Sequence, residues 1–375
     1  MREVASPGVE DVIEWPPAWP PAWPRVLERE FGPPPPGDYR AIPEDFRVEE
    51  VLDFVPGGEG EHLWLFIEKR DLTTAMVARE LARLCEVSPR VVGYAGMKDR
   101  VAVTRQWFSV QLPGREAPAG LVAQLAEHDI RVLDRARHPR KLKRGVHRAN
   151  RFCLRLTGAA VADSALEARW QRLCSAGVAN YVGPQRFGAD GRNLQRARAV
   201  LARGWRKRDD REGMLLSAAR SFLFNELLAA RVRDDSWATP LPGEVVMLDG
   251  SASQFSLAPD DEAQRIELVE RARRLDLHPT GVLWGVGESR ALGEAEAHEA
   301  ALVARYPGLC GGLERAGVRL ARRALRLRLG DPRLTRGDGE LWLTFSLPRG
   351  AFATAVLREL LSHPSLGAPP TDRSL

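Results

Sequence analysis

Alternating apolar and polar residues near both ends of the chain enclose a long middle region with a different pattern, and this order constrains the fold most. Residues 47–70 alternate as strands do when both sheet faces are at least partly buried. Residues 325–329 and 341–347 show the same alternation. The region from about 179 to 312 reads mainly as helices with irregular connections. We therefore predict an α+β domain assembled from both ends of the chain and interrupted by an inserted domain.

The size and composition of the chain are those of a globular protein with more than one domain. Its 375 residues exceed a comfortable single core, and 44% hydrophobic with 28% charged residues is ordinary for a soluble protein. No apolar run approaches the roughly 18 residues that span a bilayer. The first residues lack the basic start and apolar centre of a secretory signal. We expect a cytoplasmic protein with no membrane partner.

Cysteine and histidine residues give no sign of a metal site. The four cysteines are far apart and form no Cys-x-x-Cys pair: Cys85, Cys153, Cys174 and Cys310. The seven histidines are scattered and include no His-Glu-x-x-His or comparable spacing. We expect reduced, mostly buried thiols, and neither a zinc site nor a disulfide framework.

Residues 93–110 contain one carboxylate, that of Asp99. It lies on the connection between a strand-like run that ends near Tyr94 and a second run that includes Trp107. Three cations neighbour it in the sequence: Lys98, Arg100 and Arg105. Cations within about 4 to 6 Å would keep the carboxylate ionised, which suits chemistry on an anionic substrate. On local chemistry alone, an Asp in a turn more often caps backbone N–H groups or makes a surface ion pair.

A basic stretch from 135 to 155 carries nine Lys or Arg and no Asp or Glu. Such a run is either a solvated face or a phosphate-binding segment. Here it continues into Asn150 and Phe152, an amide and an aromatic at the start of a strand, and this combination is typical of sites that hold unpaired bases. The RNA interpretation is therefore favoured. The candidates for contacts with the RNA backbone are Arg140, Lys141, Lys143, Arg144 and Arg148.

Several long motifs recur in the order found in one known family. They are Pro43-Glu44-Asp45-Phe46, Gly58-Glu59-Gly60-Glu61-His62, Ala95-Gly96-Met97-Lys98-Asp99, Asn150-Arg151-Phe152, Asn180-Tyr181-Val182-Gly183-Pro184-Gln185-Arg186-Phe187-Gly188 and Ser217-Ala218-Ala219-Arg220-Ser221. Together they cover most of residues 41–360, and the chain resembles the TruD family of tRNA pseudouridine synthases. So many long motifs in the right order leave little room for coincidence.

The resemblance implies a fold and a division into domains. The fold is a pseudouridine synthase core with a mixed, largely antiparallel sheet and packed helices, interrupted by an inserted α/β TRUD domain. We expect the core in residues 41–178 and 313–375, and the TRUD domain in 179–312. Residues 1–40 are rich in Pro and Trp and lie outside the resemblance. They form either a loosely packed leader or a segment whose Trp side chains cover an apolar patch or dock a partner.

The resemblance also implies an active site with Asp99 as the catalytic residue. Phe152 would stack on the extruded uridine, Asn150 would position Asp99 or the nucleotide, and Phe46 would line the same pocket. On their own patterns the two Phe residues would be core residues and the Asn a turn residue. Four further residues are expected to take part in substrate binding. Lys98 and Arg105 would either pair with Asp99 or contact phosphate. Gln185 and Arg186 would help to form the cleft between the domains, unless they belong to a structural loop.

Pseudouridine formation breaks the N1 glycosidic bond of a uridine, turns the base and joins C5 to the same sugar, so it needs no metal and no cofactor. Asp99 would either form a covalent adduct with C1′ or stabilise and deprotonate a glycal-forming intermediate, and the sequence leaves both routes open. The resemblance points to uridine 13 in the D arm of tRNA. We expect an isomerase that binds tRNA, not DNA, and acts as a monomer.

Two other classes of function are considered. A noncatalytic tRNA-binding chaperone would use the same basic stretch and aromatics but would tolerate the loss of Asp99. A metal-dependent nuclease would need several clustered carboxylates to hold magnesium, and the Asp99 motif supplies one carboxylate followed by cations. The chaperone is the alternative that the sequence leaves open.

Overall fold

The chain folds into two compact units, and the computed structural model describes residues 19–205 and 210–367. We call residues 35–170 and 329–351 the sheet unit. The helical unit contains 171–328 together with the described residues before 35 and after 351. Each unit has its own hydrophobic core.

These units differ from the predicted functional domains at several places, including residues 171–178, which cluster with the helical unit although the sequence assigned them to the catalytic core. Residues 313–328 and the described residues from 352 onward cluster with the helical unit, whereas the sequence assigned both segments to the catalytic core. Compactness and function need not divide a chain at the same points. The domain assignment of 41–178, 179–312 and 313–375 therefore stays a prediction.

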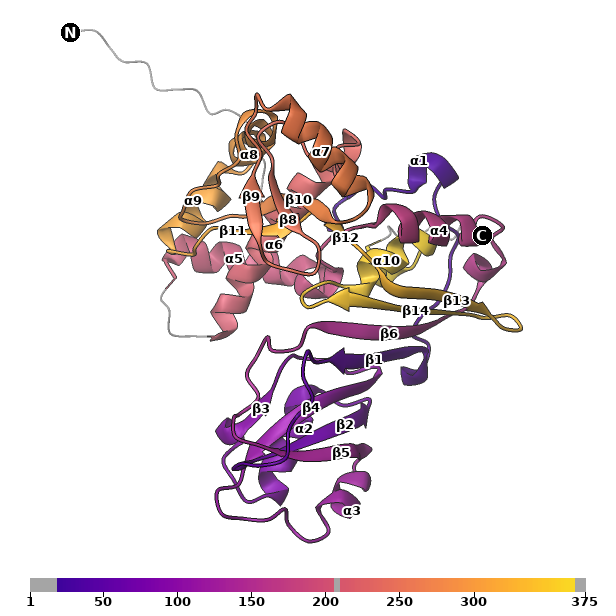
Figure 1. Ribbon diagram of the computed structural model, residues 1–375, viewed down its shortest axis with the longest axis vertical. Helices are drawn as coiled ribbons and strands as arrows, with labels where there is room; N and C mark the ends of the chain where they lie inside the picture. The colour runs from indigo at the N-terminus through magenta and orange to yellow at the C-terminus, as the bar shows by residue number, and fades with distance from the viewer. Residues whose placement is uncertain (1–18, 206–209, 368–375) are drawn as a thin grey trace, which may run out of the picture. The chain divides into compact units, whose positions relative to one another are not determined.

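The sheet unit is built on an eight-stranded sheet with the order β13-β14-β6-β1-β4-β2-β5, and β3 also pairs with β4 (Figure 1). Its strands are β1 (Phe46–Val51), β2 (His62–Arg70), β3 (Val92–Tyr94), β4 (Val103–Gln111), β5 (Ile130–His138), β6 (Ala149–Leu156), β13 (Gly330–Arg336) and β14 (Leu341–Pro348). Strands β1 and β4 run parallel, and the other described pairs of this sheet are antiparallel. The predicted α+β class and the mixed, largely antiparallel sheet are confirmed.

Helix α2 (Thr74–Leu84) covers part of one face of this sheet. Thr73 caps it, because its hydroxyl accepts a hydrogen bond from a backbone N–H of the first turn at 3.2 Å. Val77 and Leu81 are fully buried against the inward positions of β2, including Leu65 and Ile67. Each such side chain contributes roughly 1.5–3 kcal/mol when it leaves water. The remaining short elements are α3 (Leu121–Ala126), η1 (Pro43–Asp45), η2 (Pro89–Val91) and η3 (Ala159–Ala162), and α4 (Leu166–Ala176) begins in this unit.

The helical unit surrounds the long helix α6 (Asp210–Arg233). Phe222, Leu223 and Phe224 are fully buried on consecutive positions, so this part of α6 is buried on all sides and lies in the core. The other helices are α1 (Glu28–Phe31), α5 (Arg192–Arg203), α7 (Glu262–Arg273), α8 (Gly293–Arg305), α9 (Pro307–Arg315) and α10 (Ala353–Leu360), with 3-10 turns η4 (Pro184–Arg186), η5 (Ala189–Gly191) and η6 (Pro364–Leu366). Its strands are β7 (Val178–Ala179), β8 (Val245–Leu248), β9 (Gln254–Ser256), β10 (Leu277–Leu283), β11 (Ala321–Ala324) and β12 (Arg326–Leu327).

The N-terminal segment packs against the core of the helical unit from residue 19 onward. The Trp19 ring lies 5.4 Å from that of Phe187, and the Trp23 ring stacks at 6.1 Å on Tyr181. The indole N–H of Trp23 also donates to Glu226 at 2.7 Å. A loosely packed leader is therefore wrong for this segment, and covering of an apolar surface is the alternative that the structure supports. Residues 1–18, with Trp15, lie outside the described residues.

Candidate active site

Asp99 lies on the loop of residues 95–102, which connects β3 to β4. Its carboxylate oxygen Oδ2 is 3.8 Å from Nη2 of Arg40, and the Asp99 side chain keeps 44% of its surface exposed. The Arg40 guanidinium lies over the ring of Phe46, 4.1 Å from its centroid. The loop therefore presents an accessible carboxylate beside a cation that is itself held on an aromatic face.

The backbone around Asp99 is fixed by hydrogen bonds from neighbouring elements. The Thr74 hydroxyl donates to Gln106 at 2.9 Å and accepts the backbone N–H of Lys98 at 2.9 Å. The Gln106 amide then donates to the carbonyl of Gly96 at 3.0 Å. Both polar side chains are fully buried. A satisfied buried network of this kind restricts the loop to one conformation.

Two buried lysines hold the same loop, one from β2 and one from within the loop itself. Lys69 Nζ donates to the backbone carbonyl of Asp99 at 2.8 Å. Lys98 Nζ lies 2.8 Å from Glu50 Oε2, with both side chains almost completely buried. Burial raises the pKa of Glu50, and the charge and hydrogen bond of Lys98 act against that rise. The expected pairing of Lys98 with Asp99 is therefore wrong: Glu50 is its partner, and Arg40 takes the place beside Asp99.

Phe46 and Phe152 lie together in a buried aromatic group. Their rings meet edge to face at 6.1 Å, and Phe152 stacks on Phe345 at 5.4 Å. The three rings are 2%, 6% and 0% exposed respectively. The pairing of β1 with β6 explains the contact, because Val48 faces Phe152 across the two strands and Phe46 is on the same side as Val48. Any stacking of a base on Phe152 would have to use the small part of this ring that remains exposed.

Asn150 and His147 approach the lysine and glutamate pair from the start of β6. Asn150 is in register with Glu50, and its Oδ1 is buried without a hydrogen-bond partner among the described residues. A Cβ on Gly96 would come within 3.2 Å of His147 and 3.4 Å of Lys98 Nζ, so a larger residue here would have to displace these two side chains slightly. Burial, followed by the charges of Lys98 and Arg349, lowers the pKa of His147 to about 4.

The structure does not bring Arg105 together with Asp99. Arg105 alternates with Thr104 and Gln106 along β4, so its side chain points to the opposite face of the sheet. There it contacts Glu68 at 2.8 Å and Glu49 at 3.3 Å. The expected pairing of Arg105 with Asp99 is therefore wrong.

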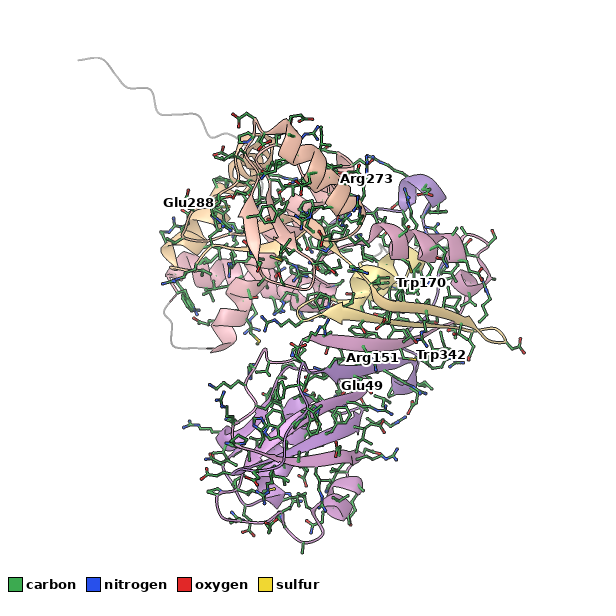
Figure 2. The ribbon with its side chains drawn as sticks, in the orientation of Figure 1. Glu49, Arg151, Trp170, Arg273, Glu288 and Trp342 are labelled. Atoms are coloured by element: carbon green, nitrogen blue, oxygen red, sulfur yellow. The ribbon has the colours of Figure 1, made fainter. Side chains whose placement is uncertain are left out.

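That opposite face carries a groove of about 800 Å³, which is therefore not at Asp99. Figure 2 shows Glu49 and Arg151 on the adjacent strands β1 and β6, where they form an ion pair at 3.4 Å. Three of the carboxylates that line the groove pair with its arginines: Glu49 as above, Glu68 with Arg131 and Glu44 with Arg70. The lining holds five arginines and four carboxylates, so its charges are largely but not fully balanced.

The five candidates of the basic stretch lie on the loop of residues 139–148, between β5 and β6. Four of its five candidates are exposed, and Lys141 is half-buried with its Nζ donating to the Arg90 carbonyl at 2.5 Å. Arg144 donates to the hydroxyl of Tyr94 at 3.1 Å, and Arg148 lies 3.6 Å from Asp53. The loop belongs to the same unit as Asp99 and presents its cations largely to solvent.

Gln185 and Arg186 belong to the helical unit, on the 3-10 turn η4. Gln185 is exposed, while Arg186 is half-buried beside the ring of Phe352, 5.9 Å from its centroid. Burial lowers the pKa of Arg186. Because they lie in the other unit, their participation in the site of Asp99 stays a prediction.

Sequence reasoning did not assign a role to Arg40, Glu50 or Lys69. Lys69 carried a usable signal, because it continues the inward positions of β2 after Leu65 and Ile67, where an apolar residue is expected. Glu50 likewise follows Phe46 and Val48 on the same side of β1. A charged residue on an inward position of a strand must have a buried partner.

The remaining observations concern metal sites, thiols and membrane helices. Within the described residues, no three His, Cys, Asp or Glu side chains gather as a metal site would need. The four cysteines are free, with Cys85 and Cys310 buried and Cys153 and Cys174 half-buried. Among the described helices, none is both long enough and apolar enough to cross a bilayer.

The chain matches a protein family over nearly its whole length. The family model described as tRNA pseudouridine synthase D (TruD) matches residues 33–208 and 208–360. The tRNA pseudouridine synthase D of Chromohalobacter salexigens is 60% identical over 353 residues, which is 94% of this chain and 98% of that protein. The protein of the same name from Pseudomonas putida is 46% identical over 330 residues, or 88% of this chain and 92% of its own.

A solved structure supports the fold independently of close sequence similarity. The structure from Methanosarcina mazei that bears the name tRNA pseudouridine synthase D (TruD) aligns with a TM-score of 0.68 at 19% identity, covering 89% of this chain and 95% of its own. At that identity the likeness shows the fold alone. The family model and the close relatives carry the further conclusion, and the chain belongs to the TruD family of tRNA pseudouridine synthases.

Proposed function

We propose that the chain converts uridine 13 in the D arm of tRNA to pseudouridine, with Asp99 as the catalytic residue. The observation that carries this proposal is the placement of Asp99: its carboxylate is accessible and lies beside Arg40, while its backbone is held by buried groups. An accessible carboxylate on a fixed backbone is what nucleophilic attack or proton abstraction at one sugar requires.

The reaction is an isomerisation in which atoms and electrons balance within the nucleotide. The bond from N1 to C1′ breaks, the bond from C5 to C1′ forms, the C5 proton leaves and N1 gains a proton. Asp99 acts either by attacking C1′ or by deprotonating the sugar toward a glycal. In both routes the uridine must leave the helical stack, because a stacked base shields the sugar carbon and the C5 edge.

The proposed substrate contacts come from the groups around Asp99 and from the basic loop. Phe46, Asn150 and Phe152 border the site, with the unsatisfied Asn150 amide oxygen as a candidate acceptor for a substrate group. Lys98 acts through its buried pair with Glu50 by holding the loop. The basic loop is proposed to contact RNA phosphates, and Gln185 and Arg186 to contribute from the helical unit. Pairing of Arg105 with Asp99 is not proposed, because its side chain is on the other face of the sheet; its alternative role, a contact with an RNA phosphate, stays proposed.

The experiment is position-resolved mass spectrometry of pseudouridine in an unmodified tRNA transcript incubated with the purified protein. The wild type is compared with Asp99→Asn and with Asp276→Asn, a matched change of an exposed Asp that pairs with Arg271 in the helical unit. We expect pseudouridine at position 13 with the wild type and Asp276→Asn, and at least a roughly 1,000-fold slower reaction with Asp99→Asn, as for removal of a nucleophile or base.

Two outcomes would contradict the proposal. Equal conversion by Asp99→Asn would remove Asp99 from the chemistry. Modification at another uridine would refute position 13 while leaving the synthase activity intact.

Light scattering on the same sample tests the proposed monomer, and localisation of the tagged protein in cells tests the proposed cytoplasmic location.

A further inference from the structure

Lys69 is a fully buried lysine on the inward face of β2. It follows Leu65 and Ile67 on that face and has no exposed surface. Its neighbours across the sheet are Thr104 on β4 and Ile130 on β5. An ammonium group in such surroundings is costly to bury unless its N–H groups are satisfied.

The contacts of Lys69 are directed at the loop that carries Asp99. Its Nζ donates to the backbone carbonyl of Asp99 at 2.8 Å and to the carbonyl of Leu72. Leu72 lies in the connection before α2, whose Thr74 holds Lys98. Lys69 therefore ties the catalytic loop both to its own strand and to the start of the helix.

The folding of the sheet unit alone does not account for a charged residue here. An apolar side chain at this position would extend the buried surface of Leu65 and Ile67 without the cost of desolvating an ammonium. What the lysine adds is a donor to Asp99 and a positive charge near its carboxylate. These two contributions of Lys69 would favour the reaction if it depends on the position and the charge of the Asp99 carboxylate.

We propose that Lys69 is a positioning residue of the reaction, which fixes the backbone of Asp99 through a charge-assisted hydrogen bond. The proposal deepens the proposed function and rests on it, because it requires Asp99 to be the catalytic group. Lys69 touches no substrate atom in this role. It acts by keeping the Asp99 carboxylate within the small range of positions from which it reaches the sugar.

The charge of Lys69 is sensitive to pH within an accessible range. Burial lowers the pKa of Lys69 to about 8, while the carboxylates of Asp99 and Asp71 act against that shift and Lys98 adds to it. Arg40 also lies 3.8 Å from the carboxylate of Asp99. As pH rises through about 8, Lys69 loses its proton, so its hydrogen bond to Asp99 weakens and its charge disappears.

The test measures single-turnover conversion of tRNA and tRNA affinity for the full chain with Lys69→Met and Lys69→Arg. The matched control is Arg70→Met, the next residue in β2, which is exposed and pairs with Glu44 on the opposite face. We expect Lys69→Met to slow conversion by about 10- to 100-fold, as misplacement of a catalytic group by about 1 Å does. Its tRNA affinity should stay within about threefold of wild type, and Arg70→Met should behave as wild type.

The pH profile separates positioning from a merely structural role. The wild-type rate constant should fall as pH rises through about 8, the pH at which Lys69 loses its proton. Lys69→Arg keeps its charge and should lose this decline. A rate for Lys69→Met within twofold of wild type would overturn the proposal, as would a parallel loss of rate and affinity. If both variants fail to fold, a wild-type rate that is flat from about pH 7 to 9 overturns it, and a decline supports it.

The same experiment includes Asp99→Asn, so the two proposals can fail separately. If the wild type forms no pseudouridine, or Asp99→Asn is fully active, the proposed function fails and this inference fails with it. If Asp99→Asn is inactive and Lys69→Met is unaffected, only the positioning role of Lys69 is refuted.

Discussion

The loop of Asp99 and the basic loop of residues 139–148 belong to the same unit but present their charged groups differently. In the first, buried side chains from β2, α2 and β4 fix backbone groups at Gly96, Lys98 and Asp99, and β1 holds the Lys98 side chain. In the second, the side chains of Trp64 and Ser109 also fix backbone groups, but four of the five candidate cations are exposed. The difference matches the role proposed for each loop: bond making at one carbon depends on position, whereas attraction to a phosphate backbone depends mainly on charge.

The largest expected effect comes from breaking the buried pair that holds the first loop. Glu50→Ala leaves the ammonium of Lys98 buried without its partner, so we expect the free energy of unfolding to fall by about 3–5 kcal/mol. Glu49→Ala, one residue earlier on the exposed face, should lower it by less than about 1 kcal/mol. Urea unfolding followed by circular dichroism measures both.

A double variant sharpens the interpretation of this result. In Glu50→Met with Lys98→Met, no charge is left unpaired, so most of the lost stability should return. If the pair also positions Asp99, pseudouridine formation should stay impaired in the double variant. Full recovery of both stability and activity would show that the pair serves the fold alone.

The second effect concerns His147, the buried side chain at which the two loops meet. Its pKa is lowered to about 4 in the folded chain and is ordinarily near 6.5. Between these two values the unfolded chain binds a proton that the folded chain does not, so stability rises with pH across this window and is lost as pH falls through it. We expect a loss of about 1–3 kcal/mol between pH 6.5 and pH 4 from this residue.

Unfolding measured at several pH values checks this expectation. His147→Leu should flatten the acid limb of the stability curve, whereas His128→Leu, which changes an exposed histidine, should leave it in place. An acid limb that is unchanged in His147→Leu would show that other groups cause it. His147 would then not be the buried side chain that links the two loops.

The sequence predicted much of the fold because its patterns are local. The alternation in β2 and β14 and the helical spacing in α2 are confirmed in position and in packing. The alternation at 325–329 misled, since one strand was expected there. The structure has β12 (Arg326–Leu327) and then β13 from Gly330, and the division between the units falls after Arg328. Alternation of apolar and polar residues in the sequence indicates which side chains are buried. It does not indicate in which structural unit they are buried.

The candidate site was predicted less completely, because its contacts join residues far apart in the chain. Asp99 and Phe46 were found through motifs, but the partner of a charge is not readable from its neighbours in sequence. Arg105 is close to Asp99 along the chain and lies on the other face of the sheet, while Arg40 is distant along the chain and lies beside it. Strand alternation alone could have separated Arg105 from Gln106, and the pairing of Lys98 with Glu50 required the sheet order.

The smallest expected effect tests the second loop. Lys143 and Arg144 are exposed, and we propose that each meets RNA through charge. Lys143→Gln and Arg144→Gln should each weaken tRNA binding severalfold at low salt and reduce the slope of log affinity against log salt by about 0.7–0.9, the share of one phosphate contact. The rate of conversion at saturating tRNA should not change, because neither side chain holds the Asp99 loop. Arg83→Gln, on α2 and paired with Glu80, is the matched control and should leave the slope unchanged. If either loop variant lowered the saturated rate and left the salt slope intact, the basic loop would act by position, and the contrast between the two loops would be wrong.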